Sequence, residues 1–153
     1  MTAATKGSDP LESHWQAIVR HSPLALLRDL AGTLIALSRT PDDADVDPEL
    51  HELLTRCVAL PHVAVVVVSG RPQSWTSRRF DEMPGLWLAA EHGAWRRAAG
   101  AWEHSLELDP APLEMLAHEL DPIAARYPGS IIERKTWSIS IHSRAVPAAG
   151  RIA

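Results

Sequence analysis

Residues 63–72 read Val-Ala-Val-Val-Val-Val-Ser-Gly-Arg-Pro, and this stretch decides which fold we expect. Six apolar residues without polar alternation are typical of a strand covered on both faces, as in a parallel sheet. A polar turn begins at Ser69, directly after the strand. Ligands of such sheets bind at the carboxyl ends of the strands. The stretch therefore predicts an α/β fold with a ligand site beside Ser69.

The segments before this strand follow the same strand-and-helix order. Asp9-Pro10 and Asp47-Pro48 each combine an N-cap residue with a proline at the first helical position, so we expect helices to begin there. Between them, Leu24–Leu27 predicts a short strand that leads into Asp29. Two parallel strands would then end in Asp29 and Ser69 at the same edge of the sheet.

The segments after residue 72 predict a helix over about 73–82 and a strand over 86–89. Residues 95–108 predict a hairpin that turns near Ala99-Gly100. An amphipathic helix follows from Pro112, with Pro122 expected to kink or split it. The last patterned segments are strands at 131–132 and 137–141. This second half is typical of an α+β unit.

Composition excludes several classes of protein. A chain of 153 residues that is 46% hydrophobic fits one domain and is not intrinsically disordered. Its single cysteine, Cys57, excludes a disulfide scaffold and favours a reduced, cytoplasmic setting. A formal charge of −4 argues against a nucleic-acid partner. No apolar run is long enough to span a membrane, and the oligomeric state stays open.

Asp29 and Ser69 are the first candidates for chemistry. A carboxylate at the end of a strand can attack a phosphoryl group and form an aspartyl phosphate. The Ser69 hydroxyl and nearby backbone N–H groups could hold phosphate oxygens. Taken singly, a turn aspartate and an N-cap serine are the commoner explanations. Their pairing on successive strands is the stronger signal.

Four ordered stretches carry a family resemblance. Asp29–Leu34 resembles motif I of the haloacid dehalogenase-like phosphatases, Asp-x-Asp-Gly-Thr-Leu, and Ser69–Pro72 resembles their motif II. Glu91–Ala94 reads Glu-His-Gly-Ala, and residues 133–144 place Glu, Lys, Ser, His and Arg in the pattern of the trehalose-6-phosphate phosphatase family. The resemblance spans residues 24–144.

The resemblance implies an α/β fold with a haloacid dehalogenase-like Rossmannoid parallel sheet and a partial α+β cap. Residues 1–10 would be a disordered N-terminus, and residues 11–94 the N-terminal part of the phosphatase core. Residues 95–144 would form the partial cap domain, followed by an unpatterned tail over 145–153.

The resemblance also implies a reaction, the hydrolysis of trehalose 6-phosphate to trehalose and phosphate in trehalose biosynthesis, with magnesium as cofactor. Asp29 would be the nucleophile and, with the backbone carbonyl of Ala31, a magnesium ligand. Phosphate would be bound by Ser69, Gly70 and Arg71. The sugar would be bound by Glu91, His92, Glu133, Lys135 and His142.

Four departures from the family pattern predict a weakly active or inactive phosphatase. Ala31 stands where the family has an aspartate that protonates the leaving oxygen and activates water, and losing such a group typically costs about 10²–10⁴-fold in rate. Arg28 occupies a usually apolar strand position, and Ser143 replaces a tyrosine. Residues 145–153 contain no Lys, Asp or Glu, so we do not expect the family's phosphate-binding lysine and acidic pair there.

Two alternatives remain open at this point. A non-catalytic sugar-phosphate-binding or regulatory protein would keep the sugar-facing residues without proton transfer. A phosphonate-cleaving relative has a motif I of Asp-x-Ala-Gly-Thr, which matches Asp29–Thr33 better. That relative needs a cap directly after motif I, whereas a helix and a strand are expected here.

Overall fold

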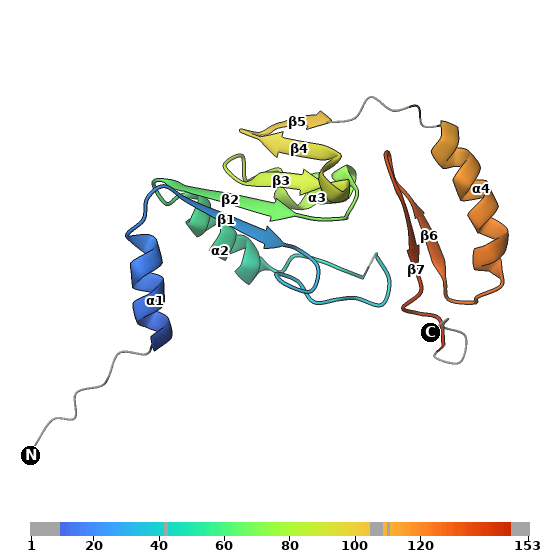
Figure 1. The fold of residues 1–153 in the computed structure, drawn as a ribbon, viewed down its shortest axis with the longest axis horizontal. Coiled ribbons are helices and arrows are strands. Elements are labelled where there is room, and N and C mark those ends of the chain that lie inside the picture. The colour runs from blue at the N-terminus through green and yellow to red at the C-terminus, as the bar shows by residue number, and fades with distance from the viewer. Residues whose placement is uncertain (1–9, 42, 105–108, 110, 148–153) are drawn as a thin grey trace, which may run out of the picture.

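The computed structural model describes residues 10–41, 43–104, 109 and 111–147 (Figure 1). These residues form a five-stranded sheet in the order β1-β2-β3-β4-β5 and a separate two-stranded sheet, β6-β7. The helices are α1 Pro10–Val19, α2 Pro48–Val58, α3 Gln73–Phe80 and α4 Ala111–Ala125. The strands are β1 Leu24–Asp29, β2 Val63–Val68, β3 Trp87–Ala90, β4 Trp95–Ala98, β5 Ala101–His104, β6 Ile131–Arg134 and β7 Ile139–His142.

The first three strands are parallel, which confirms the predicted α/β core. β1 pairs with β2 in a register that sets Asp29 opposite Val68, and β2 pairs with β3. The predicted start of α2 is also confirmed, because the Asp47 carboxylate accepts a hydrogen bond from the Leu50 N–H at 2.7 Å. Residues 1–9 of the predicted disordered start and 148–153 of the predicted tail lie outside the described residues, whereas Pro10 is the first residue of α1.

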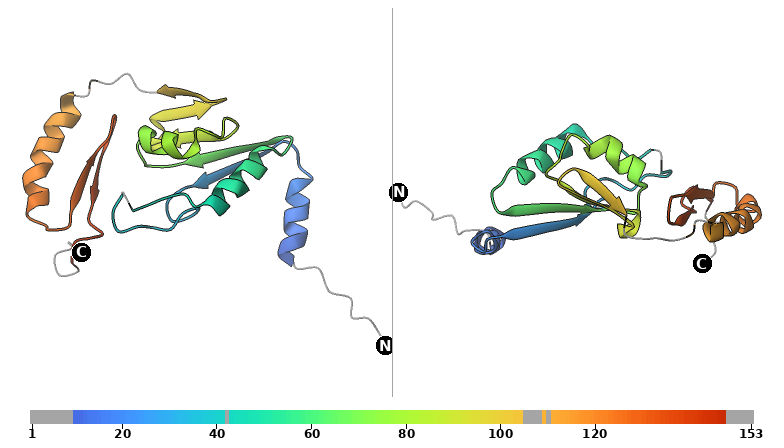
Figure 2. Two further views of the ribbon diagram at one scale, coloured as in Figure 1. Left: turned by 180° about the vertical axis from the view of Figure 1, so that it is seen from behind. Right: turned by 90° about the horizontal axis from the view of Figure 1, so that it is seen from above.

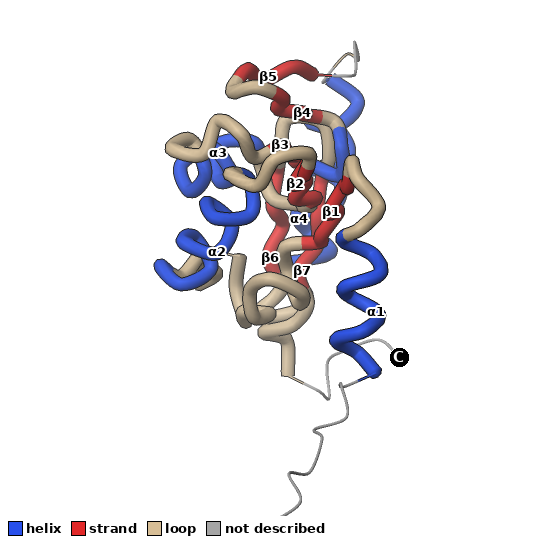
Figure 3. The backbone as a smooth tube through the Cα atoms, turned by 90° about the vertical axis from the view of Figure 1, so that its left-hand side faces the viewer, coloured by secondary structure: helices blue, strands red, loops and turns tan. Residues whose placement is uncertain are grey.

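The prediction that β2 is covered on both faces is wrong for the described structure. The side chain of Val67 is 1% exposed, whereas Val66 and Val68 are only half-buried and Leu27 on β1 is 64% exposed. Both α2 and α3 lie on the same side of the sheet (Figures 2 and 3). The strands add in one direction, and right-handed crossovers then place both helices on one face. Arg28 is accordingly exposed, not buried.

The hairpin β4–β5 extends the core sheet, which corrects its placement in the cap. β4 pairs antiparallel with β3, with Ala90 opposite Trp95. Only four residues separate β3 from β4, so the chain folds straight back onto the free edge of β3. Residues 105–108 of the predicted hairpin lie outside the described part.

The second unit, called the cap below, consists of α4 packed against β6 of the two-stranded sheet β6–β7 (Figure 1). α4 continues through Pro122 as one helix, so the predicted split does not occur. Pro122 lies in the last turn, where it removes a single backbone hydrogen bond. The Ser130 hydroxyl donates to the Ala124 carbonyl at 2.8 Å just beyond the helix. No helix in the described ranges is both long and apolar enough to cross a membrane.

Arg97 on β4 joins the hairpin to the core from inside. The residue is 2% exposed, and its guanidinium donates to the Phe80 and Met83 carbonyls at 2.9 Å each and to the Asp81 carboxylate at 3.1 Å. Burial lowers the pKa of Arg97, and the charge of Asp81 opposes this effect. The guanidinium thus donates to carbonyls at the end of α3 and in the turn that follows it.

We expect Arg97→Ala to lower the free energy of unfolding by about 2–4 kcal/mol, because it leaves buried carbonyls unpaired and opens a cavity. Arg96→Ala, its exposed neighbour on the same strand, is the matched control and should change stability by about 0.5 kcal/mol or less. Urea denaturation measures both. Equal effects of the two substitutions would contradict this account of Arg97.

Candidate active site

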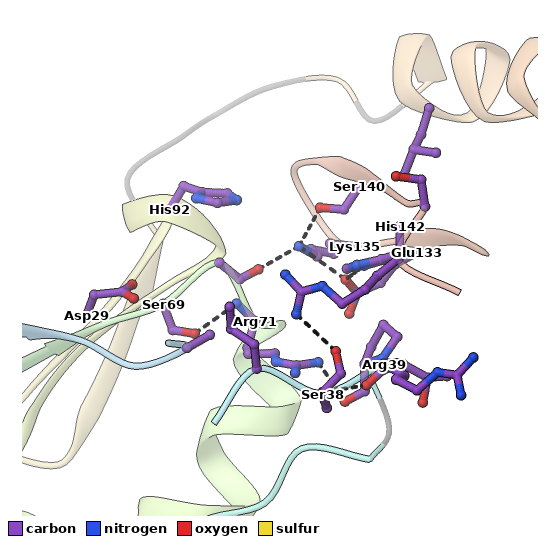
Figure 4. A pocket seen from close by; sticks show the side chains of 18 of the residues that line it. Asp29, Ser38, Arg39, Ser69, Arg71, His92, Glu133, Lys135, Ser140 and His142 are labelled. Atoms are coloured by element: carbon purple, nitrogen blue, oxygen red, sulfur yellow. Dashed lines mark hydrogen bonds and ion pairs between the residues drawn. The ribbon is translucent and has the colours of Figure 1, made fainter. Parts of the chain in front are cut away.

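A pocket of about 590 Å³ lies between the carboxyl ends of β1 and β2 and the hairpin β6–β7 (Figure 4). This volume is within the range of sites for small organic ligands. The core side contributes Asp29, Ala31, Ser69, Gly70, Arg71 and His92. The cap side contributes Glu133, Lys135 and His142. Every residue predicted for the site except Glu91 therefore lines one pocket.

Asp29 is the last residue of β1, and its exposed carboxylate makes no hydrogen bond or ion pair with another described residue. A tight turn follows, in which the N–H groups of Leu34 and Ile35 donate to the Leu30 carbonyl. Gly32 adopts φ +86°, a conformation that favours glycine. The turn's hydrogen bonds leave the Ala31 carbonyl unused, beside Asp29 at the pocket.

Ser69 does not cap the helix that follows it. α3 begins at Gln73 with Pro72 as its N-cap, and the Ser69 hydroxyl oxygen instead accepts a hydrogen bond from the Arg71 N–H at 3.1 Å. The Ser69 N–H donates to the Ala89 carbonyl at 2.8 Å, which continues the sheet. The residue is buried in a turn at the end of β2, so the N-cap explanation fails.

Residues 91–93 form a left-handed segment above this turn. Glu91 and His92 have φ of 48° and 59°, values that are uncommon for residues with a side chain. The Glu91 N–H donates to the Arg71 carbonyl at 2.9 Å, and the His92 N–H donates to the Ser69 carbonyl at 3.1 Å. A Cβ on Gly70 would lie 2.5 Å from His92 Cε1. Only glycine at position 70 allows this approach.

Glu91 is placed away from the pocket. It is 3% exposed, and its Oε2 accepts a hydrogen bond from the Trp137 N–H at 3.0 Å. The carboxylate therefore connects the end of β3 to the loop between β6 and β7. Its sequence motif predicted a place near the sugar, but the structure gives it a contact between core and cap.

Lys135 also connects the cap to the core. Its Nζ lies 2.6 Å from the Gly70 carbonyl, 2.8 Å from the Ser140 hydroxyl and 3.3 Å from Glu133 Oε2. The three N–H donors of the ammonium thus have three acceptors, and the side chain is 3% exposed. Glu133 Oε2 also lies 2.8 Å from His142 Nε2. These three residues form one cluster on the cap side.

The pocket has a third wall that the sequence analysis missed, residues 36–41. Arg71 donates to the Pro41 carbonyl at 2.7 Å, and Arg144 donates to the Ser38 carbonyl at 3.0 Å. The loop is thus held by one arginine from the core and one from the cap. Its sequence shows no periodicity and no motif, so only its proximity in the fold identifies it.

The pocket is positively charged although the whole chain is negative. A surplus of positive charge in a cleft favours an anionic ligand. The basic side chains at its wall are Arg39, Arg71, Lys135 and Arg144, and the acidic ones are Asp29 and Glu133.

The pocket also offers oxygen ligands for a cation. Mg²⁺ is commonly held by one or two carboxylates, with water and substrate phosphate completing its coordination. The unpaired Asp29 carboxylate and the Ala31 carbonyl fit this pattern. Among the described residues no group of three or more His, Cys, Asp or Glu side chains could hold a metal by itself.

Comparisons with known proteins agree with this geometry. A family model described as trehalose-phosphatase matches residues 27–152. The chain is 36% identical over 120 residues to a bifunctional trehalose-6-phosphate synthase/phosphatase of Thermoproteus tenax, covering 78% of the chain and 16% of that protein. It is 30% identical over 155 residues to a trehalose-phosphatase of Saccharomyces cerevisiae, covering 98% and 17%.

Among solved structures, the C-terminal domain of Candida albicans trehalose-6-phosphate phosphatase superposes with a TM-score of 0.81 at 23% identity. That match covers 88% of this chain and 47% of the other. The likeness concerns the fold. The chain spans less than half the length of each of these three proteins.

We expect Glu91→Ala to loosen the cap from the core, because it removes the carboxylate acceptor for the partly buried Trp137 N–H at a cost of about 1.5–3 kcal/mol. Amide hydrogen exchange in β6 and β7 should speed up, while exchange in β2 stays unchanged. Glu103→Ala on the exposed part of β5 is the matched control. Unchanged exchange in β6 and β7 of Glu91→Ala would show that this contact does not hold the cap.

Proposed function

The chain belongs to the trehalose-phosphatase family, and on this premise we propose that its pocket binds trehalose 6-phosphate and transfers the phosphoryl group to Asp29. The α/β fold is that of the haloacid dehalogenase-like phosphatases, in agreement with the trehalose-6-phosphate phosphatase structure it resembles. The reaction as a whole would be hydrolysis to trehalose and phosphate.

One observation carries the proposal, namely that residues from four distant motifs meet at one pocket. The core side presents the Asp29 carboxylate and the Ser69–Arg71 turn, which suit a phosphate group. The cap side presents Glu133 and His142, which suit sugar hydroxyls. A phosphorylated disaccharide has both kinds of group, and the positive charge of the pocket fits its phosphate dianion.

Asp29 would be the nucleophile of the reaction. Its carboxylate oxygen would form a bond to phosphorus while the ester P–O bond breaks, and the electron pair would pass to the sugar oxygen. Water would then attack phosphorus and return the electron pair to the carboxylate. Ala31 has no proton to give or take in either step, so we expect slow turnover.

The family implies a divalent metal cofactor, and we propose Mg²⁺, held by the Asp29 carboxylate and the Ala31 carbonyl. When bound it would offset the charge of the phosphate. Ser69, Gly70 and Arg71 would hold the phosphate oxygens. We also propose a cytoplasmic setting, because the single cysteine, Cys57, is half-buried and unpaired.

We expect calorimetry to detect binding of trehalose 6-phosphate and much weaker binding of trehalose, since trehalose lacks the charged group. With Mg²⁺ present, phosphate release should be slow and should stop in Asp29→Asn, which keeps the shape of the side chain but is a poor nucleophile. Binding of trehalose 6-phosphate is the first readout, and phosphate release is the second.

Release that continues in Asp29→Asn would contradict the role of Asp29. Binding without any release in the unsubstituted chain would favour the alternative of a non-catalytic sugar-phosphate-binding protein. No binding of trehalose 6-phosphate would refute both.

We expect Ala31→Asp alone not to restore rapid turnover. The pocket's other acidic side chain, Glu133, is engaged by Lys135 and His142, so the described residues offer no further carboxylate beside Asp29 for a metal. Phosphate release from trehalose 6-phosphate, compared with the unsubstituted chain, measures this. A rise of about 10²-fold or more would show that proton transfer was the only missing element.

A further inference from the structure

Among the described residues, one side chain of the pocket can transfer a proton near neutral pH and makes no hydrogen bond or ion pair of its own. Histidine is the side chain that titrates in this range. His142 is bound to Glu133, and the three donors of Lys135 are all in use. Within the described part of the chain, the His92 side chain makes no hydrogen bond or ion pair, although it lines the pocket and is exposed to it.

The backbone holds His92 at the turn expected to bind phosphate. Its N–H and that of Glu91 donate to the two carbonyls on either side of Gly70, those of Ser69 and Arg71. The imidazole packs on Gly70 so closely that no Cβ fits there. Figure 4 shows the ring on the core side, with Asp29 and Ser69, across from the cap cluster.

The conformation of this segment is strained, because two successive residues with side chains have left-handed φ angles. Such conformations persist only where surrounding contacts enforce them, and they occur preferentially at functional sites. Here the contacts are the two hydrogen bonds to the turn and the buried Glu91 carboxylate. Their combined effect is to present the His92 ring to the pocket.

We propose that His92 is a catalytic residue that exchanges a proton with the phosphate ester bound at the Ser69–Arg71 turn. This inference rests on the proposed function and supplies the proton that Ala31 cannot. As the bond from Asp29 to phosphorus forms and the ester P–O bond breaks, the imidazolium donates its proton to the departing sugar oxygen. The neutral imidazole then accepts a proton from the water that attacks phosphorus.

Asp29, Ser69, Gly70 and Arg71 line the same pocket as His92. Because the imidazole packs on Gly70, a phosphate held at the Ser69–Arg71 turn would lie beside the ring.

Proton NMR of the full chain with inorganic phosphate tests the proposal without requiring turnover. The Cε1–H signals of the eight histidines are followed as phosphate is added, and His92→Gln identifies the signal of His92. Saturating phosphate should shift the His92 signal. The signal of His142, which is already bound to Glu133, should shift much less.

Gly70→Ala provides a second variant that leaves His92 in place in the sequence. A Cβ at position 70 would overlap the imidazole, so the ring must move and its response to phosphate should be lost. Gly85→Ala is the matched control, because its Cβ would meet Val58 at an ordinary 3.5 Å. A retained response in Gly70→Ala would contradict the placement of His92 at the phosphate.

A substrate whose leaving group needs no proton distinguishes proton donation by His92 from contact alone. His92→Gln should slow hydrolysis of trehalose 6-phosphate by about 10²-fold or more, and hydrolysis of 4-nitrophenyl phosphate far less. Equal slowing of the two substrates would contradict proton donation.

The two proposals can fail separately. If phosphate binds and the His92 signal does not shift, this inference is refuted and the proposed function stands. If neither phosphate nor trehalose 6-phosphate binds, the proposed function is refuted and this inference with it.

Discussion

The parallel register of β1 and β2 is the constraint on which the rest of the structure depends. It sets Asp29 opposite Val68, so the carboxylate ends its strand level with the start of the Ser69 turn. A shift of one residue would turn every side chain of β1 to the other face of the sheet. The strand order β1-β2-β3, with right-handed crossovers, places α2 and α3 on one face. The carboxyl ends of β1 and β2 then face the cap across the pocket.

The cap is attached to the core through polar contacts and through one ring contact between His104 on β5 and Trp137, whose centroids lie 5.9 Å apart. The buried core consists of residues from β2, β3, α2 and α3 and from the loops between these elements, including Leu30, Ile35 and Ala44. Between core and cap stand the contacts of Lys135 with Gly70, of Glu91 with Trp137 and of Arg144 with Ser38. Residues that the motif pattern assigned to sugar binding thus also assemble the pocket.

Local sequence signals were sufficient for most elements. The Asp47-Pro48 cap, the valine run and the Ala99-Gly100 turn act on their own neighbours in the chain, so their structures could be predicted. The pairing of the β4–β5 hairpin with β3 could not be predicted, because the free edge of β3 is a property of the folded sheet. The open face of β2 was missed for the same reason, since an apolar run does not reveal on which side its helices pack.

The sequence by itself determined the family pattern, the order of the elements and the motif residues that meet at the pocket, because motifs and periodicity are local properties of a chain. Only the tertiary structure decided what those residues do there. It turned Glu91 away from the pocket, used every donor of Lys135, and brought the 36–41 loop to the wall. It also set His92 against Gly70 through a left-handed backbone that hydrogen bonds from distant residues hold in place. Such bonds depend on distances that arise only when strands far apart in the sequence pair.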